Sequence, residues 1–145
     1  MKRLVGLLLA AVVAVPAVLA QASPASAATP TCTTVKHKIV QVDYIGSLPA
    51  TSSGSSTCLL YEGLSNAGVK ALQVTLNKCF GEHLAEDGIF GPLTRSALIR
   101  AQQAVGTAAD GVYGPDTRDR FNANRKWAAI RDILPLRIIC TNLGT

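Results

Sequence analysis

Aspartate, aromatic and arginine side chains recur at fixed spacing in the second half of the chain. The segment DGIFGPLT at residues 87–94 returns as DGVYGPDT at residues 110–117, an offset of 23 residues, and an arginine follows each copy. Each copy offers an aspartate, an aromatic ring and an arginine, which are residue types able to accept hydrogen bonds, to stack and to donate paired hydrogen bonds. Residues of these types could contact a ligand, although folding alone explains the motif better. The candidate contact residues are Asp87, Gly88, Phe90, Gly91, Arg95, Asp110, Gly111, Tyr113, Gly114 and Arg118.

The same residues also have a purely structural explanation. Asp-Gly is a turn dipeptide, in which the aspartate bonds the following backbone and the glycine supplies positive φ without steric cost. The second glycine suits a helix N-cap, and the proline after it suits the first helical position. In this alternative the aromatic residues are core anchors and the arginines are exposed side chains. Each copy is therefore a tight loop that starts a helix, with or without a ligand.

Catalytic chemistry has little support in the sequence. The two histidines, His37 and His83, have no partner at metal-binding spacing, and no two cysteines lie closer than 21 residues apart. Glu82, Glu86 and Asp87 form an acidic cluster, but a solvated loop explains it better than a pair of glycan-cleaving carboxylates. We therefore expect no catalytic residue, no metal site and no cofactor, and we predict that the protein is not an enzyme.

Three helices are predicted to position the two loops. The first is capped by Ser65 or Asn66 and continues to about Cys79, because apolar residues recur there three and four positions apart. The second is expected over residues 92–105, where Gly106 ends it. The third starts at residue 115 and is expected to continue through Trp127 to residue 134.

β-structure is predicted only near the two ends of the chain. Residues 33–44 are rich in β-branched side chains and are predicted to form an irregular strand, and the polar segment 51–57 a flexible loop. Residues 136–140 are apolar, and we expect them to pair with the N-terminal strand.

These motifs resemble a known family. The run VKALQ at residues 69–73, followed by the two repeated loops, is similar to the type 1 peptidoglycan-binding domain, over roughly residues 58–127. The chain departs from many members late in the second helix, where they carry Phe-Gln and this chain carries Ala101-Gln102. The resemblance implies a small three-helix module of the kind often attached to cell-wall hydrolases. It also implies binding of peptidoglycan, by its peptide stem, in a groove between the loops and the helices.

The fold class that follows is mainly α. We expect a three-helix module with duplicated DGxxGPxT loops, a small β extension from the N- and C-terminal segments, and disulfide staples. The predicted division is a signal peptide at residues 1–27, an N-terminal extension with one or two strands at 28–57, the three-helix domain at 58–127 and a C-terminal tail at 128–145.

The first residues have the pattern of a secretory signal peptide. A basic start precedes an apolar run, and the small residues Ala25-Ser26-Ala27 suit cleavage. The mature chain would hold 12 basic and 9 acidic residues, a net charge of +3. No basic run has the density expected for nucleic acid, and no membrane contact is expected after cleavage. The predicted location is secreted, either extracellular or associated with the cell wall.

The four cysteines are predicted to form two disulfides. An even count in a small secreted chain favours crosslinks over free thiols, and three pairings are possible. We favour Cys58–Cys79, which would tie the lead-in of the first helix to its end, and Cys32–Cys140, which would tie the two chain ends together.

The function predicted from the sequence is a non-catalytic secreted module that binds peptidoglycan. The alternative is a secreted protein-interaction or inhibitor protein on the same scaffold, with an extracellular protein partner that the sequence does not identify. The extra N-terminal and C-terminal segments favour this alternative modestly, because a minimal wall anchor needs neither.

Overall fold

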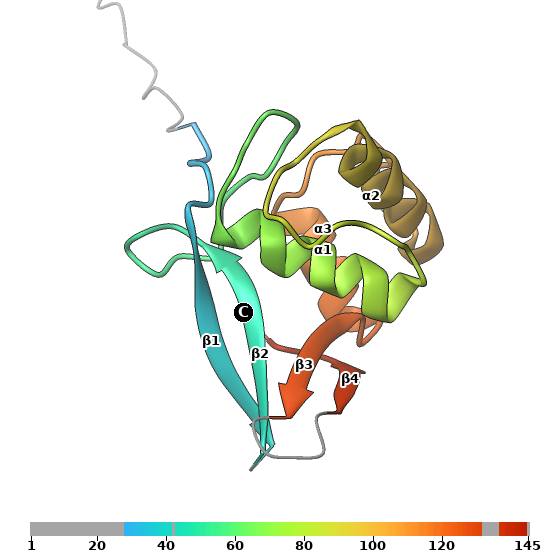
Figure 1. Ribbon diagram of the computed structural model, residues 1–145. Coiled ribbons are helices and arrows are strands. Elements are labelled where there is room, and N and C mark those ends of the chain that lie inside the picture. The colour runs from blue at the N-terminus through green and yellow to red at the C-terminus, as the bar shows by residue number, and fades with distance from the viewer. Residues whose placement is uncertain (1–27, 42, 132–136, 145) are drawn as a thin grey trace, which may run out of the picture.

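Four antiparallel strands and three helices make up the fold (Figure 1). The computed structural model describes residues 28–41, 43–131 and 137–144, so the predicted signal peptide lies outside the described residues. The strands lie in the sheet in the order β1-β2-β3-β4. In Figure 1 α1 lies across the sheet, α2 lies on the side of α1 away from the sheet, and α3 is seen behind α1. The elements in chain order are β1 (Thr34–Gln41), β2 (Tyr44–Ala50), α1 (Ala67–Phe80), α2 (Pro92–Val105), α3 (Pro115–Ala123), β3 (Trp127–Arg131) and β4 (Ile138–Thr141).

The prediction of a mainly α fold is wrong. The strands hold 8, 7, 5 and 4 residues beside helices of 14, 14 and 9 residues, so the protein combines α and β structure. The difference arises at the third helix, which ends at Ala123 instead of continuing to residue 134. Arg125 takes a left-handed conformation there (φ 53°), and the N–H of Lys126 donates to the carbonyl of Phe121, which is the bond of a helix-terminating Schellman turn. The chain then enters β3.

β4 is also placed differently from the prediction. It pairs with β3, not with the N-terminal strand, and β2 separates β1 from β3. β1 and β4 therefore belong to one continuous sheet but are not neighbours in it.

The starts of the three helices agree with the sequence. The side chain of Asn66 caps α1 by accepting a bond of 3.1 Å from the N–H of Val69. α2 and α3 each begin with proline after an N-cap glycine, and Gly106 ends α2 in a left-handed conformation (φ 69°). Local residue chemistry therefore fixes where each loop ends and its helix begins.

One core joins the helices, the loops and the sheet. Phe121 of α3 packs against Trp127 of β3 with ring centroids 5.6 Å apart, and Tyr113 packs edge-on against the same tryptophan at 5.9 Å. Ala101 is only 1% exposed and packs in this core. The sheet is thus part of the same hydrophobic core as the helical module.

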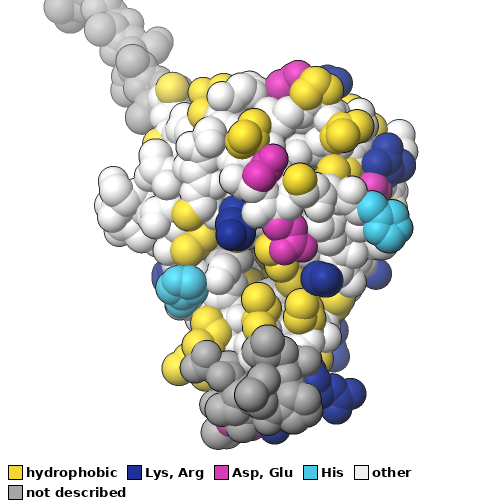
Figure 2. Space-filling view, viewed as in Figure 1, with side chains coloured by type: hydrophobic (Ala, Val, Ile, Leu, Met, Phe, Trp, Pro, Cys, Tyr) yellow, Lys and Arg dark blue, Asp and Glu magenta, His cyan; other side chains and the backbone are white. Residues whose placement is uncertain are grey.

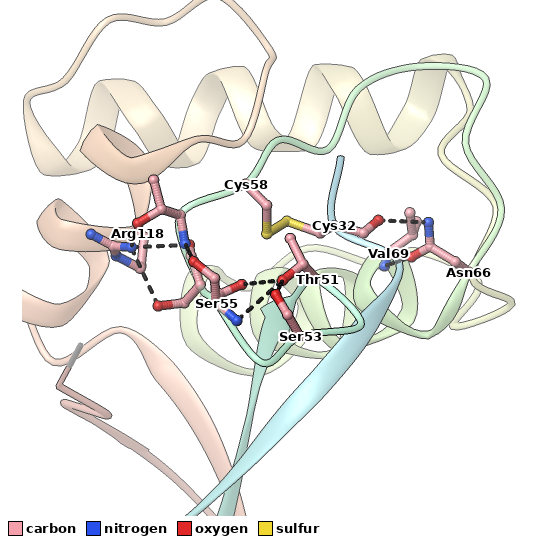
Figure 3. The surroundings of a disulfide bond; sticks show 10 residues. Cys32, Thr51, Ser53, Ser55, Cys58, Asn66, Val69 and Arg118 are labelled. Atoms are coloured by element: carbon pink, nitrogen blue, oxygen red, sulfur yellow. Dashed lines mark hydrogen bonds between the residues drawn. A yellow bond between two sulfur atoms is a disulfide. The ribbon is translucent and has the colours of Figure 1, made fainter. Parts of the chain in front are cut away.

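The favoured disulfide pairing is also wrong. The bonds join Cys32 to Cys58 and Cys79 to Cys140, not Cys58 to Cys79 and Cys32 to Cys140. The chain before β1 runs alongside the lead-in of the first helix, where the N–H of Cys32 donates to the carbonyl of Leu59 at 2.9 Å, and this brings Cys32 beside Cys58 (Figure 3). The second bond ties the end of α1 to β4.

Candidate functional site

A buried glutamine holds the first repeated loop. Gln73 of α1 is 2% exposed, and its Nε2 donates to Asp87 Oδ1 at 2.9 Å, to the carbonyl of Ile89 at 3.0 Å and to Thr94 Oγ1 at 3.3 Å. Its Oε1 accepts the N–H of Gly88 at 2.8 Å. One side chain therefore links the helix to the whole turn that follows it.

The second loop repeats this network. Gln102 of α2 donates to Asp110 Oδ1 at 2.9 Å, to the carbonyl of Val112 at 3.0 Å and to Thr117 Oγ1 at 3.0 Å, and it accepts the N–H of Gly111 at 2.9 Å. The structural repeat is thus a helix with an inward glutamine followed by a DGxxGPxT loop.

Sequence reasoning did not identify these two glutamines as site residues. Gln73 precedes its aspartate by 14 residues, whereas Gln102 precedes its aspartate by 8 residues. Because the first loop is longer, the glutamines do not share the 23-residue offset of the loops. The signal that could have found them is a Gln among the apolar positions of the helix before each loop, as at Gln73 and Gln102.

The two turn glycines have the predicted backbone. Gly88 and Gly111 take φ values of 79° and 74°, which side chains rarely adopt. Space is also short, because a Cβ on Gly88 would lie 3.0 Å from the carbonyl oxygen of Asn66, and one on Gly111 would lie 2.7 Å from Cγ of Arg95. Both conformation and packing therefore call for glycine.

The aromatic residues of the two loops point inward. Phe90 is 1% exposed and Tyr113 is fully buried, so their positions favour the alternative in which they anchor the core. Burial raises the pKa of the Tyr113 hydroxyl far above its usual value.

The two predicted arginines differ in their surroundings. Arg118 is buried, contrary to expectation: it donates to the carbonyl of Ser56 at 2.9 Å and to Asp119 at 2.8 Å, and so ties α3 to the serine-rich loop (Figure 3). Arg95 is exposed, and its Nη2 donates to the carbonyl of Asp110 at 3.1 Å. Only Arg95 of the pair presents its guanidinium group on the surface.

Each repeated loop carries a hollow on its outer side, and the two hollows are equivalent. The first hollow has a volume of about 180 Å³ and is lined by residues 84, 85, 87, 89 and 91–94, together with Gln73. The second hollow has a volume of about 170 Å³ and is lined by residues 107, 108, 110, 112 and 114–117, together with Leu59. Each of the first eight positions lies 23 residues before its counterpart, so the duplication has produced two related surface sites.

The chemistry of the two hollows has diverged. Leu84 and Leu93 of the first hollow are replaced by Thr107 and Asp116 in the second. The first hollow is therefore mostly apolar, and Leu93 is 77% exposed there. The second holds two carboxylates, Asp110 and Asp116, and a neighbouring hollow that shares Asp116 includes Asp119 and Arg120.

The carboxylate of Asp87 is held as an anion in the first hollow. The N–H of Ile89 donates to it at 2.9 Å, and this bond, followed by the bond from Gln73, holds the pKa of Asp87 below its usual value. The same N–H bond recurs in the second loop, where Val112 donates to Asp110 at 2.9 Å.

The acidic cluster beside the first loop has structural partners. Glu82 accepts from Arg100 Nε at 2.8 Å, and this pair lowers the pKa of Glu82. Glu86 accepts from Asn77 Nδ2 at 3.0 Å. Within residues 28–41, 43–131 and 137–144, no group of three or more His, Cys, Asp and Glu side chains has the arrangement to hold a metal ion. No helix in this part of the chain is long and apolar enough to cross a membrane.

A known protein family and a solved structure are similar to parts of this chain. No curated protein matches the chain. A crystal structure of a peptidoglycan-binding protein from Clostridioides difficile, solved in complex with glutamine hydroxamate, is similar at 28% sequence identity and a TM-score of 0.45, and the match covers 60% of this chain and 54% of that one. This chain thus matches about half the length of that protein. The resemblance seen in the sequence is confirmed, because residues 65–121 match the family of putative peptidoglycan binding domains.

Proposed function

We propose that this protein binds bacterial cell-wall peptidoglycan without cleaving it, and that the two repeat hollows receive the peptide stem. The observation that carries the proposal is the family match at residues 65–121, because this segment includes α1, both repeated loops and nearly all the lining of both hollows. The site proposed here is therefore built from the duplicated part of the chain, and the sheet lies outside it.

The lining of the hollows favours a peptide over a bare glycan strand. The first hollow offers the exposed apolar side chains of Ile89 and Leu93, which suit a small apolar side chain. The second offers Asp110 and Asp116, which suit an ammonium group. A peptide carries both kinds of group, whereas neutral sugar rings carry no cation.

Arg95 is the candidate for contact with a peptide carboxylate. It lies on α2 after the first loop and reaches the backbone of the second, so it stands between the two copies of the repeat. A guanidinium group has five donors, and the bond to Asp110 uses one of them. Arg118 has no such role in the proposal, because its donors are engaged with Ser56 and Asp119.

We also propose that the protein acts outside the cytoplasm, in the cell wall or the medium. Two disulfides suit an oxidising compartment. They also stabilise a small domain whose core is limited by its size.

Co-sedimentation with purified, protein-free peptidoglycan tests the proposal. The mature protein is expected to pellet with the wall fraction and to leave the turbidity of the suspension unchanged. Binding is expected to weaken at high salt, because its charge component is screened. A fall in turbidity would reveal a hydrolase, and failure to pellet at low salt would favour the protein-interaction alternative.

Exchange between equivalent positions tests the hollows themselves. Leu93→Asp makes the first hollow resemble the second, and Asp116→Leu does the reverse. Each is expected to weaken wall binding about tenfold, which corresponds to about 1.4 kcal/mol. The control is Gln103→Asp, an exposed position on α2 outside both hollows. Wild-type binding by both exchange variants would remove the hollows from the site.

A further inference from the structure

Four isoleucines form a row across the sheet, away from the repeated loops. Ile39 pairs with Ile45, Ile45 with Ile130, and Ile130 with Ile138, so each strand contributes one member. Paired residues share a face of the sheet, and strands lie about 4.8 Å apart, so the row is about 14 Å long. Ile39, Ile130 and Ile138 are 75%, 41% and 40% exposed. Ile45, between Ile39 and Ile130 in the row, is half-buried. A row of apolar side chains that is largely exposed marks an interaction site more often than scattered ones do.

An apolar pocket lies between this row and α1. It has a volume of about 240 Å³, and Ile45 and Ile130 of the row line it together with Val35, Ala71 and Val74. The row and the pocket therefore form one surface, which we call the isoleucine groove. In Figure 2 hydrophobic side chains gather below α1 over the sheet, and two basic side chains lie above them along α1, with an acidic side chain between the two.

The groove runs parallel to α1. The start of α1 lies over β1, where a Cβ on Gly68 would be 3.1 Å from the carbonyl oxygen of Thr34. Its end lies over β4, where Cys79 is bonded to Cys140. The isoleucine row also crosses the sheet from β1 to β4, so the groove follows the side of the helix.

The charged residue that lines the pocket is basic. Lys70 lines the pocket and Lys78 lies two turns further along the exposed face of α1, which places them about 12 Å apart. Neither lysine takes part in the three ion pairs of the described residues. No aspartate or glutamate is among the residues that line the pocket. The occupant is therefore expected to be apolar on one side and acidic along its edge.

Two other occupants fit this surface less well. A second copy of the chain would bring the same lysines to the groove, and like charges repel. A bilayer is flat, whereas this groove has a helix along one side. A single lipid has one anionic head, but the two lysines stand about 12 Å apart.

We propose that the isoleucine groove binds an amphipathic helix of a partner protein, with an apolar stripe on the row and carboxylates facing Lys70 and Lys78. Nine residues of helix span the row of about 14 Å, and neighbouring helices pack at about 8–10 Å, so the partner helix lies beside α1 on the same sheet. Carboxylates seven or eight residues apart match the two lysines. This site is separate from the proposed wall-binding hollows and does not depend on them.

A synthetic peptide tests the proposal on the full mature protein. The probe is an 18-residue helical peptide with leucine at every third or fourth position and glutamates along one edge of that stripe. Two control peptides have the same composition in permuted order, or lysines in place of the glutamates. In a methyl NMR titration, the probe is expected to shift the methyl signals of Ile39, Ile130 and Ile138. It is expected to leave that of Ile89 unchanged, although Ile89 is 55% exposed on the first loop.

Matched variants locate the contact. Ile39→Asp is expected to weaken binding of the acidic peptide about tenfold, and Leu93→Asp is expected to keep it, although the two side chains are 75% and 77% exposed. Lys70→Glu is expected to weaken binding of the acidic peptide and to strengthen binding of the lysine peptide. Lys36→Glu should change neither, because Lys36 lines a different hollow.

Four results would overturn this assignment. One is the absence of isoleucine methyl shifts at millimolar acidic peptide, and another is equal binding of the permuted peptide. The third is a preference for phosphatidylglycerol vesicles over the peptide, which would assign the groove to a lipid. The fourth is self-association that Ile39→Asp abolishes, which would assign the groove to a second copy of the chain.

Discussion

Replacing a buried helix glutamine that bonds a repeated loop by leucine is the sharpest test of how the loops are held. Gln73→Leu keeps the side-chain size but removes three donated bonds and one accepted bond. Asp87 is exposed and can bind water instead, whereas the buried N–H of Gly88 loses its acceptor. An unsatisfied buried donor costs about 1–3 kcal/mol, so the free energy of unfolding is expected to fall by about 2 kcal/mol.

The second glutamine provides a replicate within the same molecule. Gln102→Leu leaves the N–H of Gly111 without its hydrogen-bond acceptor in the same way. It also removes the side-chain bond of Thr117, whereas Thr94 keeps a second bond to the carbonyl of Ile89. We therefore expect the loss for Gln102→Leu to be the larger one, at about 3 kcal/mol.

Urea unfolding with the disulfides intact measures the loss of unfolding free energy in both variants, and thermal unfolding measures the melting temperature. The melting temperature is expected to fall by roughly 10 °C, since 1 kcal/mol corresponds to several degrees in a domain of this size. The control is Gln103→Leu, an exposed neighbour with the same chemical change, which is expected to stay within about 0.5 kcal/mol of wild type. If both buried variants unfold like the control, the glutamine networks do not hold the loops and the reasoning fails.

Three further predictions concern single side chains. Arg118→Ala is expected to lower the free energy of unfolding by about 2 kcal/mol, since it removes buried charge-assisted bonds; a urea curve that overlays the wild type would contradict this. Tyr113→Phe is expected to raise it by about 1 kcal/mol, because the buried hydroxyl has no partner among the described residues and the equivalent Phe90 has no hydroxyl; calorimetry showing a lower melting temperature would oppose this. The lowered pKa of Asp87 means that its stabilising contribution is present above its unfolded value of 3.8 and is lost as pH falls through the folded value. The melting temperature is therefore expected to fall once the pH is lowered below about 4, and to fall less steeply in Asp87→Asn than in the wild type. Parallel curves of melting temperature against pH for the two proteins would show that Asp87 does not cause the fall.

Much of the site's local structure could be predicted from the sequence. The offset of 23 residues revealed the two loops, and Asp-Gly and Gly-Pro gave their turns and helix starts. These features depend on backbone preferences within a few residues, namely positive φ at Gly88 and Gly111 and a fixed φ at the prolines. The family resemblance rests on the same short segments, so it too was visible before the fold.

Long-range contacts decided the features that the sequence reasoning missed. Residues 127–131 have no periodicity strong enough to separate helix from strand, and pairing with β2 and β4 makes them β3. The disulfide pairing follows from the path of the chain before β1 beside Leu59, which no spacing of cysteines encodes.

The sequence by itself determined the two loops, their glycines and the starts of the helices, because neighbouring residues decide these through local sterics and hydrogen bonds. Only the tertiary structure decided which side chains face solvent. It buried Phe90, Tyr113 and Arg118, placed a glutamine behind each loop, and aligned one isoleucine from each of four strands. Burial and register depend on segments far apart in the chain, so they are fixed only when those segments pack together.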